Sequence, residues 1–108
     1  MELIAEFTVN KLPAMTNASS SKHWTLKHRE RVLWQRLINE QCAFARIIGI
    51  GLEQAVLTLT RHSSKEPDFD GLVSGFKFVI DSLTRCGVIV DDKPSVIGQS
   101  RFHWQYRR

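Results

Sequence analysis

The chain has 108 residues, of which 43% are hydrophobic and 24% charged, and its formal net charge is +4 at pH 7. That length suits one domain, over residues 1–108, with a single modest core, and that composition excludes a disordered chain. The N-terminal residues lack a signal-peptide pattern, no apolar run approaches the length of a membrane span, and the two cysteines form no C-x-x-C pair. We therefore expect a cytoplasmic protein with reduced thiols, whose basic charge favours a polyanionic partner over a membrane.

A strand followed by a loop is predicted for the N-terminal segment. Apolar and polar side chains alternate over residues 3–9, as they do in a half-buried strand. The apolar face of that strand holds Leu3, Ala5, Phe7 and Val9. The polar run over residues 16–22 predicts the loop.

A long helix is predicted over residues 25–48. Its apolar side chains recur at spacings of seven, four, seven and four residues, which places them on one stripe. We expect this stripe to be buried, and its members are Leu26, Leu33, Leu37, Phe44 and Ile48. Gly49 and Gly51 are expected to end the helix. Because Gln54 occupies the third position of a G-x-G-x-x-G pattern, a dinucleotide site is rejected.

Two further strands are predicted, one over residues 55–60 and one over residues 101–107. In the first, Leu57 and Leu59 face inward. The second alternates polar residues with Phe102, Trp104 and Tyr106. These aromatic side chains either pack into the core of the domain or form an apolar row that a second subunit covers.

A second helix, predicted over residues 71–86, separates an apolar face from a polar stripe. The apolar face holds Leu72, Phe76, Leu83 and either Val79 or Ile80. The polar stripe contains Asp70, Ser74, Lys77 and Asp81, whose spacings of four, three and four residues place them on one side. Lys77 therefore shares a side with Asp70, either on an ordinary solvated face or as a catalytic lysine.

Four aspartates form two clusters, Asp68 and Asp70 before this helix and Asp91 and Asp92 after it. Crowded carboxylates are unfavourable unless a cation binds between them or one keeps its proton, and oxygen ligands suit Mg²⁺ or Mn²⁺. A shared metal site requires the chain to fold back so that the clusters meet. Aspartate pairs also cap helices and open turns, so both interpretations stay open at this point.

The acidic clusters belong to a longer pattern. Residues 67–72, 76–83 and 86–92 read PDFDGL, FKFVIDSL and CGVIVDD. They resemble the RusA-like Holliday-junction resolvases of bacteria and prophages, whose pattern is D-x-D-N-L, then K-x-x-I/F-D-x-L on a helix, then G-hydrophobic-x-x-D-D. The loop over residues 11–17 is similar to the one after the family's first strand. The resemblance implies an α+β domain with a small mixed sheet packed against two helices, in the order β-α-β-α-β.

The resemblance also implies a Mg²⁺-dependent endodeoxyribonuclease that resolves four-way DNA junctions as a homodimer. It assigns metal ligation to Asp68, Asp70 and Asp92, with Asp91 as the alternative to Asp92. Lys77, aligned backward from Asp81, matches the family's lysine and would neutralise charge on phosphate. Paired sites in a two-fold dimer would make paired cuts.

Two departures from the family pattern bear on activity. Gly71 stands where the family has asparagine, and the chain ends at Arg108, where relatives continue into a last strand. The departures make a catalytically impaired prophage DNA-binding relic one alternative to an active resolvase. A small metal-dependent nucleotide phosphohydrolase is a separate alternative, of another class.

Basic residues gather in the predicted first loop and helix, with Glu30 opposing them. They predict a DNA-binding face that contacts phosphates without base specificity, and an ordinary solvated face is the alternative. The predicted contacts are Lys11, Lys22, Lys27, Arg29, Arg31 and Arg36. Trp24 and Trp34 lie in the same region and either stack on exposed bases or, in the favoured interpretation of Trp34, pack into the core.

Overall fold

A computed structural model describes residues 2–12 and 24–108 of the chain. This part of the chain contains two strands and three helices. The elements in chain order are α1 (Trp24–Phe44), β1 (Thr58–Ser63), α2 (Phe69–Arg85), α3 (Pro94–Ile97) and β2 (Arg101–Tyr106). The predicted combination of helices and strands in a small α+β fold is confirmed at this level. None of the helices in this part of the chain is both long enough and apolar enough to cross a membrane.

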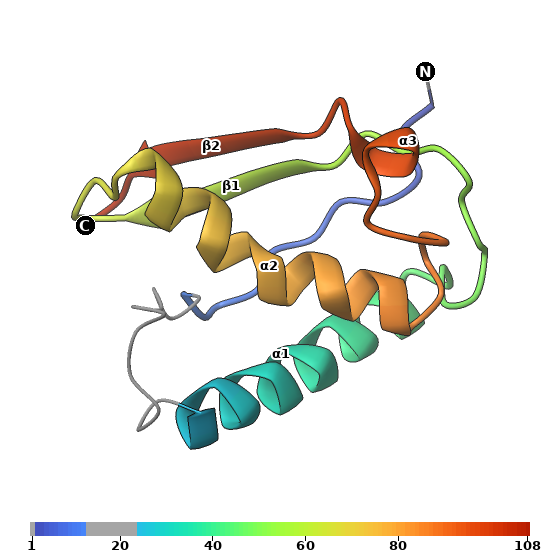
Figure 1. Ribbon diagram of the computed structural model, residues 1–108, viewed down its shortest axis with the longest axis horizontal. Coiled ribbons are helices and arrows are strands. Elements are labelled where there is room, and N and C mark those ends of the chain that lie inside the picture. The colour runs from blue at the N-terminus through green and yellow to red at the C-terminus, as the bar shows by residue number, and fades with distance from the viewer. Residues whose placement is uncertain (1, 13–23) are drawn as a thin grey trace.

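The helix α2 lies between the two strands and α1 (Figure 1). On the strand side, the Phe76 and Phe102 ring centroids are 6.0 Å apart. On the other side, Gln35 Nε2 of α1 donates a hydrogen bond to the Ser82 carbonyl at 3.1 Å. The apolar face predicted for α2 is confirmed, because its side chains are buried between the strands and α1. Its buried apolar side chains are Leu72, Phe76, Phe78, Val79 and Leu83.

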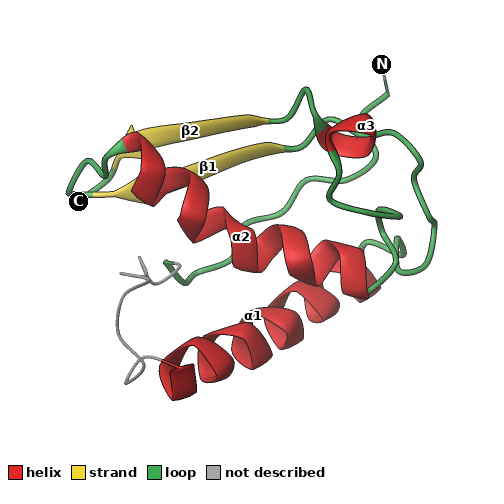
Figure 2. Ribbon diagram, in the orientation of Figure 1, coloured by secondary structure: helices red, strands yellow, loops and turns green. Residues whose placement is uncertain are grey.

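The strands β1 and β2 are parallel, with Thr58 opposite Arg101 (Figure 2). Parallel neighbours need a crossover connection, and α2 with α3 supplies it. The first strand begins at Thr58 rather than at residue 55 and runs on to Ser63. Its end is held by Trp104, whose Nε1 donates to Ser63 Oγ at 3.0 Å.

The aromatic side chains of β2 divide between the core and the surface. Phe102 and Trp104 are half-buried and pack against the core, whereas Tyr106 is 63% exposed. Of the two interpretations of this row, core packing therefore applies to its first two members.

The predicted strand over residues 3–9 is wrong as a strand. These residues have no strand assignment, and the sheet contains β1 and β2 alone among the described residues. Ala5, Phe7 and Val9 nevertheless pack against the core, and Leu3 is exposed. Alternation correctly predicts that Ala5, Phe7 and Val9 turn inward and is wrong for Leu3, and residues 3–9 do not pair as a strand.

The buried stripe of α1 also differs from the prediction. Trp34, Ile38 and Cys42 are at most 2% exposed, and they follow one another at spacings of four residues. In contrast, most of the predicted stripe is exposed, namely Leu26, Leu33, Phe44 and Ile48. The helix carries two apolar stripes, and the one containing the large Trp34 ring is the one buried. The core interpretation of Trp34 is confirmed.

The helix α1 ends before the glycines expected to end it. Its last residue is Phe44, and Arg46 already has a φ of 60°. Gly49 and Gly51 instead run beside the segment after α2, where Gly51 N donates to the Gly87 carbonyl at 2.8 Å. A Cβ on Gly87, at a φ of 76°, would lie 3.1 Å from Gly49 Cα. This close backbone contact joins the C-terminal ends of α1 and α2.

Candidate functional site

The first acidic cluster begins α2. Asp68 is the N-cap residue, and its Oδ1 accepts a hydrogen bond from the Gly71 amide at 2.7 Å. Asp70 follows in the first turn and is exposed, and a negative charge there is favoured by the helix dipole. The capping interpretation is thus confirmed for Asp68. No hydrogen-bond or ion-pair partner for the Asp70 carboxylate is found within residues 2–12 and 24–108.

Lys77 lies on the same polar stripe of α2 as Asp70, and it is exposed. Seven residues separate the two, which at 1.5 Å per residue is about 10 Å along the helix axis. Among the described residues, the ion pairs do not include Lys77. Its ammonium group can therefore meet an anion that approaches the start of α2.

The second acidic cluster forms the turn before α3. Asp91 Oδ1 accepts a hydrogen bond from the Asp92 amide at 2.7 Å, and its Oδ2 lies 3.6 Å from Lys93 Nζ. The amide hydrogen bond, and then the Lys93 charge, hold the pKa of the Asp91 carboxyl below its ordinary value. Asp92 is exposed. Asp91 therefore braces the turn.

The length of α2 separates the two clusters. This helix has 17 residues, or about 25 Å at 1.5 Å per residue. Asp68 precedes its first residue, whereas Asp92 follows its other end, from which the chain continues to α3 (Figure 1). Within the described part of the chain, no three His, Cys, Asp or Glu side chains gather as a metal-binding group. Within one chain, Asp68, Asp70 and Lys77 therefore lie in the N-terminal half of α2. Asp91 and Asp92 lie in the turn before α3, beyond the other end of that helix.

The predicted basic face lies mostly on α1. Arg29, Arg31 and Arg36 are exposed, and Lys27 is half-buried. Arg36 Nε lies 3.5 Å from Glu40 Oε1, and Lys11 Nζ lies 3.2 Å from Glu30 Oε1. The Arg36–Glu40 pair is exposed and therefore weak, so Arg36 remains available to phosphate, whereas the Lys11–Glu30 pair is half-buried. Lys22 lies outside the described residues.

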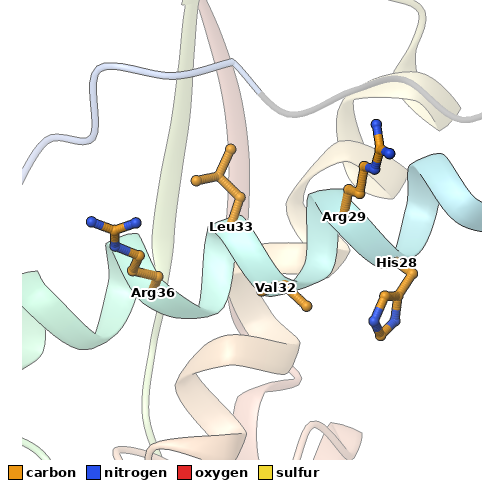
Figure 3. A pocket seen from close by; sticks show the side chains of 5 residues that line it. All are labelled: His28, Arg29, Val32, Leu33 and Arg36. Carbon is orange, nitrogen blue, oxygen red and sulfur yellow. The ribbon is translucent and has the colours of Figure 1, made fainter.

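A shallow hollow of about 350 Å³ runs along the outer side of α1. Val32 and Leu33 provide its apolar part, and Figure 3 shows Arg29 and Arg36 projecting beside Leu33. His28 completes the lining and stacks on Trp24, with ring centroids 5.8 Å apart and planes 8° from parallel. Sequence reasoning missed Val32 and this ring pair, although the i, i+4 spacing of Trp24 and His28 is a signal for the pair.

Two kinds of functional group lie on separate surfaces of the molecule. Carboxylates and one ammonium group lie along the exposed stripe of α2, and guanidinium groups with a stacked ring pair lie on α1. Trp24 is 72% exposed, so its indole is open to a flat partner such as a base.

No family model, curated protein or solved structure matches this chain. The likeness to RusA-like resolvases therefore depends on the sequence motifs over residues 67–92 and on the loop sequence over residues 11–17.

Proposed function

We propose that this protein is a Mg²⁺-dependent, structure-specific endodeoxyribonuclease that resolves four-way DNA junctions. The observation that carries the proposal is the exposed stripe of α2, on which Asp70 lies beside the N-cap Asp68 and Lys77 follows two turns along the helix. These are the residues whose types and order resemble the family's catalytic pattern. A cytoplasmic location is part of the same proposal, whereas the family's order β-α-β-α-β is not, because residues 3–9 form no strand and the described elements run α-β-α-α-β.

The Mg²⁺ site needs more than one chain supplies. Carboxylate oxygens have the right chemistry for a hard cation, and Asp68 keeps a second oxygen beside its helix-capping Oδ1, but Asp92 lies beyond the far end of α2. Within the described part of one chain the ligand set is therefore incomplete. A two-fold dimer would complete it if the start of α2 in one chain met the turn containing Asp92 in the other. Two-fold symmetry makes this contact twice and so creates two equal sites.

The residues of this chain would have separate tasks in that dimer. Arg29, Arg31 and Arg36 would bind the DNA backbone, because exposed cations on one helix attract phosphates of any sequence. Lys77 would offset charge on the phosphate held at the acidic stripe. The Trp24–His28 pair would stack on bases exposed at the branch point.

A DNA-binding protein without cleavage activity is the second candidate. The separation of the two acidic clusters along α2 favours it, as does Gly71 in place of the family's asparagine. Such a protein would bind the junction through α1 and leave all strands intact.

A cleavage assay separates these functions. The protein is incubated with a labelled synthetic four-way junction and with a linear duplex of the same sequence, each with Mg²⁺ or with EDTA. Mg²⁺-dependent paired cuts confined to the junction are expected. Junction binding without cuts would establish the DNA-binding candidate. Hydrolysis of small nucleotides with no effect on either DNA would instead indicate a nucleotide phosphohydrolase.

A further inference from the structure

The two cysteines of the chain lie far apart in sequence but side by side in the fold. Cys42 is in the last turn of α1 and is fully buried, and Cys86 is the C-cap residue of α2 and is half-buried. Both are free thiols, they are close enough for Cys86 to contribute to the raised pKa of Cys42, and the Cys86 Sγ donates a hydrogen bond to the Leu83 carbonyl at 3.6 Å. Neither residue has a part in the proposed junction cleavage.

The backbone fixes this pairing. Ile47 N donates to the Cys42 carbonyl at 3.0 Å, and Gly49 N donates to the Cys86 carbonyl at 3.0 Å. The same short segment after α1 is therefore bonded to both cysteines. The contact between Gly49 and Gly87 allows the two helix ends to approach this closely. The thiols are neighbours because of packed, hydrogen-bonded backbone rather than a chance side-chain rotamer.

The two sulfurs differ in access. Cys86 lines a hollow of about 660 Å³ at the ends of the two helices, together with Arg85 and Ile48. Cys42 has no exposed surface, and burial, with a smaller contribution from Cys86, raises the pKa of its thiol to about 12. A small oxidant therefore meets Cys86 first, while the buried Cys42 remains a protonated thiol.

We propose that Cys42 and Cys86 form an oxidation site, which a hydroperoxide converts into a disulfide bond between α1 and α2. The Cys86 thiolate attacks the peroxide, the O–O bond breaks, and a sulfenic acid forms as an alcohol or water leaves. The Cys42 sulfur then attacks that sulfenic sulfur, its proton passes to the departing hydroxyl group, and water is released. In total, two thiols lose two electrons and two protons, and the hydroperoxide is reduced to an alcohol, or to water, and a second water.

Closing the disulfide is expected to stabilise the folded chain. It would join two helices through a loop of more than forty residues, and loops of that length give cross-links a large effect on the unfolded state. We expect the melting temperature to rise on the order of 10 °C on oxidation and to return after reduction.

Peptide mapping tests the proposal on the full chain. The reduced protein is treated with one equivalent of hydrogen peroxide and digested with trypsin without reduction. We expect a cross-link between the peptide over residues 37–46 and the peptide over residues 86–101, because trypsin does not cleave before Pro94, and we expect the whole chain to be lighter by two hydrogens. Disulfides found only between chains, or Cys86 oxidised to sulfinic acid while Cys42 stays a free thiol, would overturn the proposal.

Two variants assign the order of the steps. In Cys86→Ser, Cys42 should resist the same peroxide treatment, because no exposed thiol remains. In Cys42→Ala, which avoids a buried hydroxyl, Cys86 should stop at a sulfenic acid that dimedone traps. Oxidation of Cys42 in Cys86→Ser at the wild-type rate would contradict the order. If Cys42→Ala does not fold, the wild-type peptide map alone still decides the pairing.

Discussion

The Gly71 amide donates a hydrogen bond to Asp68 Oδ1 at 2.7 Å, so one of the two carboxylates proposed to bind metal also caps α2. The cap uses a single oxygen of the carboxylate. A helix cap and a metal ligand are thus compatible on one aspartate, and different substitutions can separate the two roles.

Asp68→Asn and Asp68→Ala are predicted to differ in stability but not in activity. Asparagine caps helices about as well as aspartate, whereas alanine costs about 1 kcal/mol. Both remove the anionic ligand, so both should abolish junction cleavage. Urea unfolding monitored by tryptophan fluorescence measures the first effect, and the junction assay measures the second. Full cleavage by Asp68→Asn would show that Asp68 caps α2 and is not a metal ligand.

Asp70→Asn is predicted to abolish cleavage while junction binding stays equal or becomes tighter. Loss of one carboxylate removes a metal ligand, and it also removes repulsion between the protein and the phosphate. Because the Asp70 side chain is exposed and in the first turn of α2, the fold should persist with a stability change of about 0.5 kcal/mol. Gel-shift titration without divalent ions gives the affinity. Unchanged cleavage would refute the metal-site assignment.

The sequence predicts α2 well because its two sides differ sharply in polarity. The apolar face from Leu72 to Leu83 is buried, and the stripe with Asp70 and Lys77 faces solvent. The same reasoning fails on α1, which has apolar residues on two sides. Periodicity shows that Leu26 and Leu33 share a face, but only the packing against α2 decides that Trp34 and Ile38 are the ones buried.

The candidate site is harder to read from sequence than the helices that carry it. The type and order of the aspartates are visible in the chain, and so is the capping alternative for Asp68. Whether Asp92 returns to Asp70 depends on the 17-residue length of α2 and on the backbone pairing of Gly51 with Gly87. Contacts of this kind depend on the folded backbone, and local patterns carry no signal for them.

Substitutions on the two stripes of α1 should have very different costs. Trp34→Ala empties a fully packed position and should cost about 3–5 kcal/mol. Leu26→Ala, on the exposed stripe, should change the unfolding free energy by about 0.5 kcal/mol or less. Urea denaturation of both variants measures the difference. Equal losses would show that the exposed stripe is also buried in solution, for example against a second chain.

Salt dependence should locate the DNA-binding face. The affinity for the junction is expected to fall steeply with added salt, and Lys27→Gln with Arg31→Gln should flatten that dependence by removing about two phosphate contacts. A matched control, Lys65→Gln with Arg85→Gln, removes the same charge from exposed positions outside α1. Its slope should match the wild type. Identical slopes for all three proteins would exclude α1 as the DNA face.

The shared metal site predicts rescue between two inactive variants. In a dimer that joins Asp70 of one chain to Asp92 of the other, Asp70→Asn and Asp92→Asn each destroy both sites. A mixed dimer of the two variants has one intact site, and both substitutions fall in its other site. Because about half of the dimers in an equal mixture are mixed, the mixture should regain about a quarter of the wild-type sites. Because only one site in each mixed dimer works, the product should be a nicked junction rather than a paired cut.

Native mass spectrometry of the mixture verifies that the subunits exchange. Exchange without any recovery of nicking would exclude a site shared between chains. A species that sediments at the 12.4 kDa monomer mass at every concentration would exclude the dimer itself.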